Sequence, residues 1–271
     1  MSMSTNTDTE APDHILEVSD LVVKYGDTVV LKDISFDVRR GENFVILGGS
    51  GCGKSTLLRN LVGLMRPASG KILHNGRDFT AMSDDERVKA RRKMGMCFQG
   101  SALLGSLTVA ENVALPIREH TRLDDSIIDI MTGIKLNLVG LGEHGEHLPS
   151  ELSGGQKKRA GLARAMAMDP DIIFYDEPSA GLDPIVAAEL DMLIRKMQHT
   201  FNLTSIVVTH EMESVKIIAD RICMLKTSPE GGRIAYLGTL DGFYESDNPD
   251  VIQFRDRRPD SDDSEASAAS C

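Results

Sequence analysis

The feature that most constrains this chain is a glycine-rich turn between an apolar run and an amphipathic segment, in the stretch FVILGGSGCGKSTLLRNLVGLM at residues 44–65. Gly48, Gly53, Lys54 and Ser55 match the spacing G-x-x-x-x-G-K-[ST]. Glycines let the backbone turn its N–H groups inward around phosphate, and the following helix adds its positive N-terminal dipole. The pattern therefore predicts a strand, a loop that holds a nucleoside triphosphate, and a helix. A chance glycine-rich turn is the alternative, and the flanking strand and helix patterns disfavour it.

Each polar group of this loop has an expected role. Lys54 is predicted to reach the β- and γ-phosphates, and the Ser55 hydroxyl to bind Mg²⁺. The residues expected to cradle the nucleotide are Gly48, Gly49, Ser50, Gly51, Cys52, Gly53, Lys54, Ser55 and Thr56.

Three short apolar runs, at 43–47, 171–175 and 205–209, each precede a helix-like segment. This alternation predicts buried parallel strands in an α/β fold. The stretch 15–42 instead alternates polar and apolar residues between turns, which predicts an antiparallel β-section. With 271 residues, 41% of them hydrophobic, the chain is long enough for one large domain or a domain with a subdomain.

Charge and composition exclude several classes of protein. A net charge of -11 argues against nucleic acid as the main partner, because binding a phosphate backbone needs a basic footprint. No apolar run approaches the roughly 18 residues needed to cross a bilayer, and the first residues do not resemble a signal peptide. We therefore expect a cytoplasmic protein with polar, disordered segments at 1–14 and 258–271. Reduced thiols are predicted from the scattered cysteines, which are Cys52, Cys97, Cys223 and Cys271.

A pair of carboxylates ends the run DIIFYDEP. The carboxyl end of a strand is where ligands gather in open α/β sheets, so Asp176 is expected to hold the metal and Glu177 to polarise the attacking water. Adjacent acids before a proline also favour a solvated helix start. The phosphate loop upstream makes the catalytic interpretation the stronger one.

The motif LSGGQ at 152–156, followed by KKRAGLARAMAMDP and the DIIFYDEP run, resembles the ATP-binding cassette family of ATPases. The resemblance covers roughly 15–238. It implies a nucleotide-binding domain at 15–240, a helical subdomain at about 100–165 and a C-terminal extension at 241–257. It also implies a head-to-tail dimer that holds two ATP molecules, each facing the partner's signature residues Ser153, Gly154, Gly155 and Gln156. Physically, Ser153 can cap the helix that follows it, and the glycines leave its N–H groups open to an anion.

Further roles follow from the resemblance residue by residue. Tyr25 matches an aromatic that stacks on adenine, and Gln99 matches a glutamine that contacts Mg²⁺ and the attacking water. Asp183 matches a loop that crosses the dimer interface, and His210 matches a histidine that holds the γ-phosphate and positions Glu177. A lone tyrosine or histidine beside a strand is more often structural, so these assignments rest on the ordered set. Gly49 departs from the proline common in this loop, which predicts a slightly more flexible loop.

Three other features have competing interpretations. His144 and His147, with Glu143 and Glu146, could be drawn as a metal cluster, but the family has a variable surface connection there. Solvated helix faces or subunit contacts are predicted for the basic clusters Arg91, Arg92, Lys93 and Lys157, Lys158, Arg159. Cys52 is either a small residue that fits the loop or a reactive thiol favoured by the local positive potential.

The segment 100–121 resembles that of Mla- and Mce-type ATPases, which power phospholipid or sterol transport between bacterial envelope membranes. This implies a peripheral subunit on the cytoplasmic face of the inner membrane, with membrane permease subunits, a lipid-binding Mce-domain protein and a small cytoplasmic regulatory subunit as partners. Exporters, lipoprotein-release systems and soluble ATPases such as an iron–sulfur assembly scaffold share the catalytic motifs. The groove for a coupling helix and the subdomain core are equal alternatives for Leu103, Leu104 and Leu107.

Overall fold

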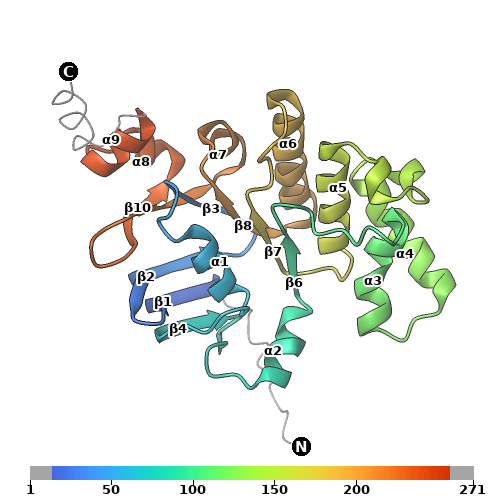
Figure 1. The fold of residues 1–271 in the computed structure, drawn as a ribbon, viewed down its shortest axis with the longest axis horizontal. Coiled ribbons are helices and arrows are strands. Elements are labelled where there is room, and N and C mark those ends of the chain that lie inside the picture. The colour runs from blue at the N-terminus through green and yellow to red at the C-terminus, as the bar shows by residue number, and fades with distance from the viewer. Residues whose placement is uncertain (1–13, 257–271) are drawn as a thin grey trace, which may run out of the picture.

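The computed structural model describes residues 14–256 and contains two sheets with helices around them (Figure 1). The predicted disordered segments lie outside the described residues except for His14. That residue begins the first strand instead, because it pairs with Arg39 and its ring lies 3.6 Å from the Asp37 carboxylate.

The central sheet is six-stranded, in the order β10-β9-β3-β8-β7-β6. Its ladders are parallel except the one between β9 and β10, which is antiparallel. The predicted parallel core is thus confirmed. The strands are β3 (Asn43–Gly48), β6 (Met94–Cys97), β7 (Ile172–Asp176), β8 (Thr204–Thr209), β9 (Arg221–Lys226) and β10 (Arg233–Thr239).

Both faces of this sheet are covered, which explains why its strands are continuously apolar. Along β3, Val45 and Leu47 enter one hydrophobic core, while Phe44 and Ile46 enter another. The same alternation holds in β7 and β8, because successive side chains of a strand point to opposite faces.

The four-stranded sheet has the order β2-β1-β4-β5 and is antiparallel throughout. This confirms the antiparallel section predicted for 15–42, which forms β1 and β2, and adds β4 and β5 to it. Its contact with the central sheet includes Phe36 stacked on Phe44, with ring centroids 5.1 Å apart. Arg221 of β9 adds hydrogen bonds to Asp37 and Glu42. The strands are β1 (His14–Tyr25), β2 (Thr28–Arg39), β4 (Ser69–His74) and β5 (Arg77–Asp78).

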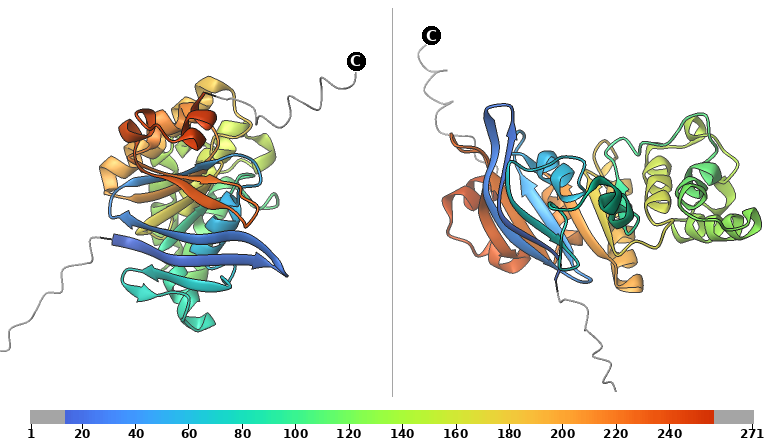
Figure 2. Two further views of the ribbon diagram at one scale, coloured as in Figure 1. Left: turned by 90° about the vertical axis from the view of Figure 1, so that its left-hand side faces the viewer. Right: turned by 90° about the horizontal axis from the view of Figure 1, so that it is seen from below.

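Helices α3, α4 and α5 lie at the end of the molecule farthest from the antiparallel sheet, and project beyond the central sheet (Figure 2). They fall in the segment predicted as a helical subdomain. Ser83, Thr108 and Ser153 each cap the helix that follows in a reciprocal capping box. The helices are α1 (Lys54–Leu61), α2 (Asp84–Arg91), α3 (Val109–His120), α4 (Asp125–Leu138), η1 (Gly142–His144), η2 (Pro149–Glu151), α5 (Gly154–Ala165), α6 (Pro184–Phe201), α7 (Met212–Ile218), α8 (Leu240–Tyr244) and α9 (Pro249–Arg255).

Candidate active site

An open cleft of about 1100 Å³ lies at the carboxyl ends of the parallel strands. Gln99 follows β6, Glu177 follows β7, His210 follows β8 and Thr227 follows β9, and all four line it. Parallel strands end at the same edge of a sheet, so residues far apart in sequence meet there. The cleft is also lined by Gly49, Ser50, Gly51, Cys52, Gly53, Lys54, Ser55 and Thr56.

The glycine-rich loop joins β3 to α1 and has the backbone that the motif requires. Gly48, Gly51 and Gly53 have φ of 153°, 77° and 100°. A Cβ on Gly48 would lie 2.5 Å from the Leu225 carbonyl oxygen, and one on Gly53 would lie 2.6 Å from Leu31 Cδ2. Side chains at these two positions would therefore displace the loop.

The start of α1 is suited to an anion. Gly53 caps it without a side-chain acceptor, and the first turn contains no acidic residue. The N–H groups of that turn therefore remain available, with the positive end of the helix dipole behind them. Lys54 is buried and donates from Nζ to the carbonyl oxygens of Gly48 (2.8 Å) and Gly49 (3.0 Å), which folds its ammonium over the loop.

Ser55 and Asp176, 121 positions apart, meet at this edge of the sheet. The Ser55 hydroxyl donates to Asp176 Oδ1 over 3.2 Å. Hydroxyl and carboxylate oxygens are hard ligands of the kind that Mg²⁺ prefers. With the exposed Gln99 amide on the same cleft, these donors fit the predicted magnesium site.

Glu177 and His210 form a close pair. His210 Nδ1 lies 2.9 Å from both carboxylate oxygens of Glu177. The Glu177 side chain is only 12% exposed while that of His210 is 57% exposed, so the ring lies on the solvent side of the carboxylate. Glu177 also has a left-handed backbone with φ of 49°, and its N–H donates to the Val208 carbonyl (2.9 Å). The strand end therefore holds this carboxylate in a defined direction.

Cys52 does not have the reactive environment considered from its position in the loop. It is 1% exposed and belongs to the core cluster between the two sheets. Burial raises the pKa of its thiol, outweighing the nearby Lys54 ammonium, which lowers it. Burial thus favours the interpretation of Cys52 as a small residue that fits the loop.

Lys158 is a residue whose importance the sequence analysis missed. Predicted as part of a solvated or subunit-contact cluster, it is partly buried and donates from Nζ to the carbonyl oxygens of Gln99 (2.5 Å) and Glu177 (3.3 Å). A signal for this was present: Lys158 follows the buried Gly155 by three positions and precedes the buried Leu162 by four, so it lies on the inner face of α5. Its neighbour Arg159 instead pairs with Glu189.

The signature residues are separate from this cleft. Ser153 accepts from the Gln156 N–H (3.2 Å), and Gln156 Oε1 accepts from the Ser153 N–H (2.9 Å). Ser153 and Gly154 are exposed, while a Cβ on Gly155 would lie 2.5 Å from Val186 Cγ1. The glycine thus allows α5 to approach α6 closely. Asp183 lies at the exposed start of α6 and accepts from the N–H groups of Ile185 and Val186.

Tyr25 lies at the end of β1, beside the turn to β2, and its residue is 48% exposed. This excludes a core role for its ring. Within residues 14–256, the cleft lining reaches β2 at Val30 but does not include Tyr25. Its predicted contact with adenine therefore stays a prediction.

The other competing interpretations are resolved by burial and contacts. His144 Nε2 lies 3.0 Å from Gln156 Nε2, so this histidine contacts the signature glutamine. Leu103 packs against the core, as one of the two interpretations predicts, while Leu104 is exposed. The groove for a coupling helix stays a prediction. Lys226 at the end of β9 and Asp250 and Phe254 of α9 also line the cleft, and the contribution of α9 was not indicated by the sequence.

Comparisons with known proteins agree with this architecture. Residues 31–180 match the family model described as "ABC transporter". The chain is 40% identical over 241 residues to the intermembrane phospholipid transport system ATP-binding protein MlaF of Haemophilus influenzae, covering 89% of this chain and 90% of that protein. It is also 40% identical over 243 residues to the probable ribonucleotide transport ATP-binding protein mkl of Mycobacterium leprae, covering 90% of this chain and 69% of that protein.

Solved structures show the same fold. The structure of cbiO1 of Clostridium perfringens, titled as part of the ABC transporter complex cbiONQ, superposes with a TM-score of 0.79 at 32% identity, covering 91% of this chain and 96% of that one. The ATP-binding cassette MJ0796, in a dimeric post-hydrolysis state bound to ADP and Pi, superposes with a TM-score of 0.74 at 30% identity, covering 83% of this chain and 98% of that one. The phosphate loop, the paired Glu177 and His210 and the capped signature helix thus occur together in a chain that belongs to the ABC transporter family and is one of its ATPases.

Proposed function

We propose that this chain supplies ATP hydrolysis to a transporter that moves phospholipid between bacterial envelope membranes. The observation that supports this best is its similarity, over about nine tenths of both chains, to a protein named for intermembrane phospholipid transport. MlaF of Escherichia coli has the same name, and this chain is 37% identical to it over 243 residues. The cleft contains the groups that the hydrolysis half of the proposal requires.

The residues of the cleft have the following proposed roles. The amides of the loop and the Lys54 ammonium hold the β- and γ-phosphates. Glu177 accepts a proton from the attacking water, and His210 orients Glu177 through Nδ1, which leaves Nε2 for a γ-phosphate oxygen. Removing a general base typically costs about 10²–10⁴-fold in rate, so Glu177→Gln is expected to bind nucleotide and lose hydrolysis.

A magnesium ion fits the donor set on the same edge of the sheet. Ser55, Asp176 and Gln99 are the residues that would hold it, directly or through water. When bound, the ion neutralises charge on the phosphates. Tyr25 is proposed to stack on adenine at the exposed end of β1.

The second half of each site is proposed to come from another copy of the chain. The start of α5 at Ser153 and Gly154 is exposed, and the first-turn N–H groups that the capping box leaves available suit a γ-phosphate. Asp183 and the 74% exposed Ile185 lie nearby at the start of α6. Head-to-tail pairing would bring these groups over the partner's phosphate loop.

Membrane association is proposed to be peripheral, on the cytoplasmic face of the inner membrane. Residues 14–256 include no helix of sufficient length and apolarity to cross a bilayer. The similarity to MlaF supports permease subunits as partners, with a Mce-domain lipid-binding protein and a small regulatory subunit as further proposed partners. Leu104 and Phe98, both exposed near Gln99, are candidate contacts for the permease.

The name of the mycobacterial relative makes ribonucleotide the competing cargo. To distinguish them, the complex is purified through a tag on this chain from its native membranes in mild detergent, and its bound lipid is identified. It is then reconstituted, and ATP-dependent transfer of a fluorescent phospholipid between vesicles is measured, with Glu177→Gln as the matched control. We expect transfer in the wild type only. Purification without membrane proteins, or hydrolysis stimulated by ribonucleotide and not by phospholipid, would contradict the proposal.

A further inference from the structure

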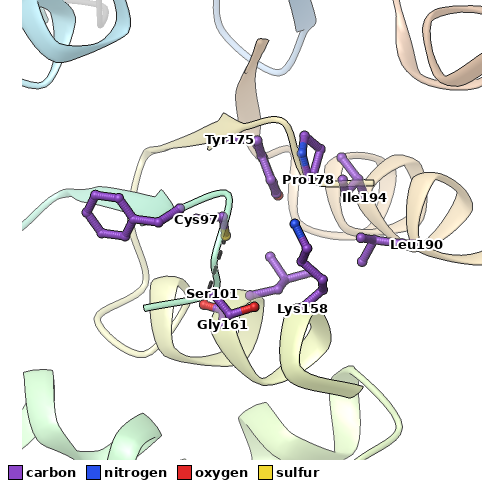
Figure 3. A pocket seen from close by; sticks show the side chains of 10 residues that line it. Cys97, Ser101, Lys158, Gly161, Tyr175, Pro178, Leu190 and Ile194 are labelled. Carbon is purple, nitrogen blue, oxygen red and sulfur yellow. Dashed lines mark hydrogen bonds between the residues drawn. The ribbon is translucent and has the colours of Figure 1, made fainter. Parts of the chain in front are cut away.

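A small pocket between α5, α6, β6 and β7 holds the side chain of Lys158 (Figure 3). The side chain rises from α5 toward Tyr175 and Pro178, which belong to β7 and the turn after it. The lining is mostly apolar, and consists of Cys97, Phe98, Ser101, Lys158, Gly161, Leu162, Tyr175, Pro178, Leu190 and Ile194. A cation in such surroundings needs polar partners at its tip, since burying an unpaired charge is costly.

Those partners come from two other segments. Nζ donates to the Gln99 carbonyl, 59 positions away, at 2.5 Å, and to the Glu177 carbonyl, 19 positions away, at 3.3 Å. An ammonium carries three N–H donors, so it can serve both carbonyls at once. One side chain of α5 thereby joins the segment after β6 to the segment after β7.

The charge balance around Lys158 also relates it to the hydrolytic groups. Burial lowers the pKa of this ammonium, whereas Cys97 and the carboxylates of Glu177, Asp176 and Glu211 raise it. Among those carboxylates are the proposed metal ligand and the proposed general base. The partly buried cation thus contacts the Glu177 backbone and has the carboxylates of Glu177 and Asp176 as electrostatic neighbours.

The backbone conformation of Glu177 suggests what the contact with Lys158 does. Its φ of 49° lies in a region that non-glycine residues seldom adopt, so neighbouring contacts must hold it. Val208 accepts from its N–H, and Lys158 and the Ala180 N–H donate to its carbonyl. Removing the ammonium would free one side of the peptide that directs the carboxylate.

We propose that Lys158 is a positioning residue for hydrolysis: it ties Gln99 and Glu177 to α5, the helix that presents Ser153 to the second copy. Docking of α5 on the partner's nucleotide is then transmitted to both segments through one ammonium. The inference rests on the proposed roles of Gln99, Glu177 and Ser153.

The test compares Lys158→Met with Lys157→Met in the intact complex. Methionine keeps an apolar stem in the pocket but carries no donor, and Lys157 is the adjacent lysine on the same helix. For Lys158→Met we expect kcat to fall about tenfold or more, with KM and the equilibrium affinity for Mg-ATP within about threefold of wild type. Lys157→Met should retain wild-type values. Lys158→Arg should recover part of kcat, because guanidinium also carries several donors.

A second readout does not depend on turnover. Hydrogen–deuterium exchange of residues 97–101 and 176–180 should be faster in Lys158→Met than in Lys157→Met, because the shared anchor of both segments is gone. Unchanged exchange with kcat within twofold of wild type would overturn the proposal. So would equal losses of kcat in the Met and Arg variants accompanied by a lower melting temperature, since that indicates a packing role only.

The outcome can be separated from that of the transport proposal. Only hydrolysis, nucleotide affinity and exchange are measured. A wild-type complex that hydrolyses ATP without transferring phospholipid contradicts the cargo, and leaves the Lys158 comparison valid.

Discussion

Three consecutive basic residues of α5 place their side chains in different environments: Lys157, Lys158 and Arg159. Lys158 enters the pocket behind the active site, and Arg159 pairs with Glu189 at 2.7 Å. The difference follows from the 100° that separates successive helical residues, so only one of the three points at the sheet. For a single residue, burial thus determines the partners and the pKa of the side chain, which the residue type alone does not. Cys52 and His74 are two further cases that can be tested.

Cys52 is expected to resist thiol reagents in the folded protein. Its side chain is buried and its pKa is raised by that burial, so little thiolate is present at neutral pH. In a Cys271→Ser background, maleimide should label Cys52 at least about tenfold more slowly than in the unfolded chain. Peptide mapping would measure this. Rapid labelling of the folded protein that Mg-ATP suppresses would instead restore the reactive-thiol interpretation.

His74 is expected to make stability fall in mild acid. It is buried between Phe79 and Phe174, and burial lowers its pKa to about 4 from 6.5. Below pH 6.5 the His74 imidazole is protonated in the unfolded chain, but in the folded chain it stays neutral until the pH approaches about 4. The free energy of unfolding therefore decreases as the pH falls through this window. From pH 7.5 to pH 5.0 the loss from this residue is about 2 kcal/mol.

Denaturant unfolding of wild type and His74→Leu at both pH values measures the contribution. The buried Asp191 acts in the opposite direction, because burial raises its pKa to about 6 and folding is favoured by its protonation. It is present in both proteins, so the difference between them isolates His74. An equal change in both proteins on acidification would refute the assignment.

Among the structural elements, helix α5 combines three separate structural features. Its exposed start carries Ser153, its inner face carries Lys158, and Gly155 lets it approach α6. Because a helix moves as a rigid unit, the capped start and the lysine about one turn later are displaced together. The capping box at Ser153 and Gln156 keeps that start well ordered.

Ser153→Arg should abolish hydrolysis while leaving nucleotide binding by the chain's own phosphate loop intact. Ser153 does not line that cleft in the described part of the chain, and we propose that it contacts the phosphate bound by a second copy. Ser153→Ala is the matched control: it removes the cap, at a cost of about 1 kcal/mol in helix stability, without filling the site. Equilibrium binding and turnover of both variants provide the comparison. Loss of nucleotide binding in Ser153→Arg would contradict the division of the site between two chains.

At the scale of the whole molecule, the phosphate loop and the signature helix of one chain are in different places. The loop is at the carboxyl edge of the central sheet, whereas α5 begins beside α6 in the projecting helical region (Figure 1). This separation fits the proposed arrangement, in which two copies pair head-to-tail and each completes the other's site. The dimeric cassette with ADP and Pi has the same fold as this chain.

Mixing two defective chains should recreate one intact site. Lys54→Ala damages the loop and Ser153→Arg damages the signature, so their mixed dimer has one site with both defects and one with neither. In a Glu177→Gln background, the mixture should retain nucleotide after rapid gel filtration, in about a quarter of the sites of an undamaged dimer at equal mixing. Each variant alone should retain little. Equal retention before and after mixing would show that the sites lie within single chains.

Local spacing along the chain was sufficient to predict a large part of this molecule. The glycines and Lys54 of the phosphate loop, the carboxylates at the end of β7 and the capped start of α5 each depend on a few adjacent residues, so the sequence determines them directly. Continuous apolar runs likewise determined the parallel sheet, because strands covered on both faces need them.

Tertiary structure decided whatever depends on packing between distant segments. Glu177 meets His210 across 33 positions, and Lys158 reaches Gln99 across 59. The antiparallel sheet closes over Cys52, and α9 brings Phe254 to the cleft. Burial and hydrogen bonding at such places depend on how close other elements approach, which no local pattern encodes. The sequence therefore determined which groups the chain has for its chemistry, and the fold decided which of them are exposed, neutral or held in place.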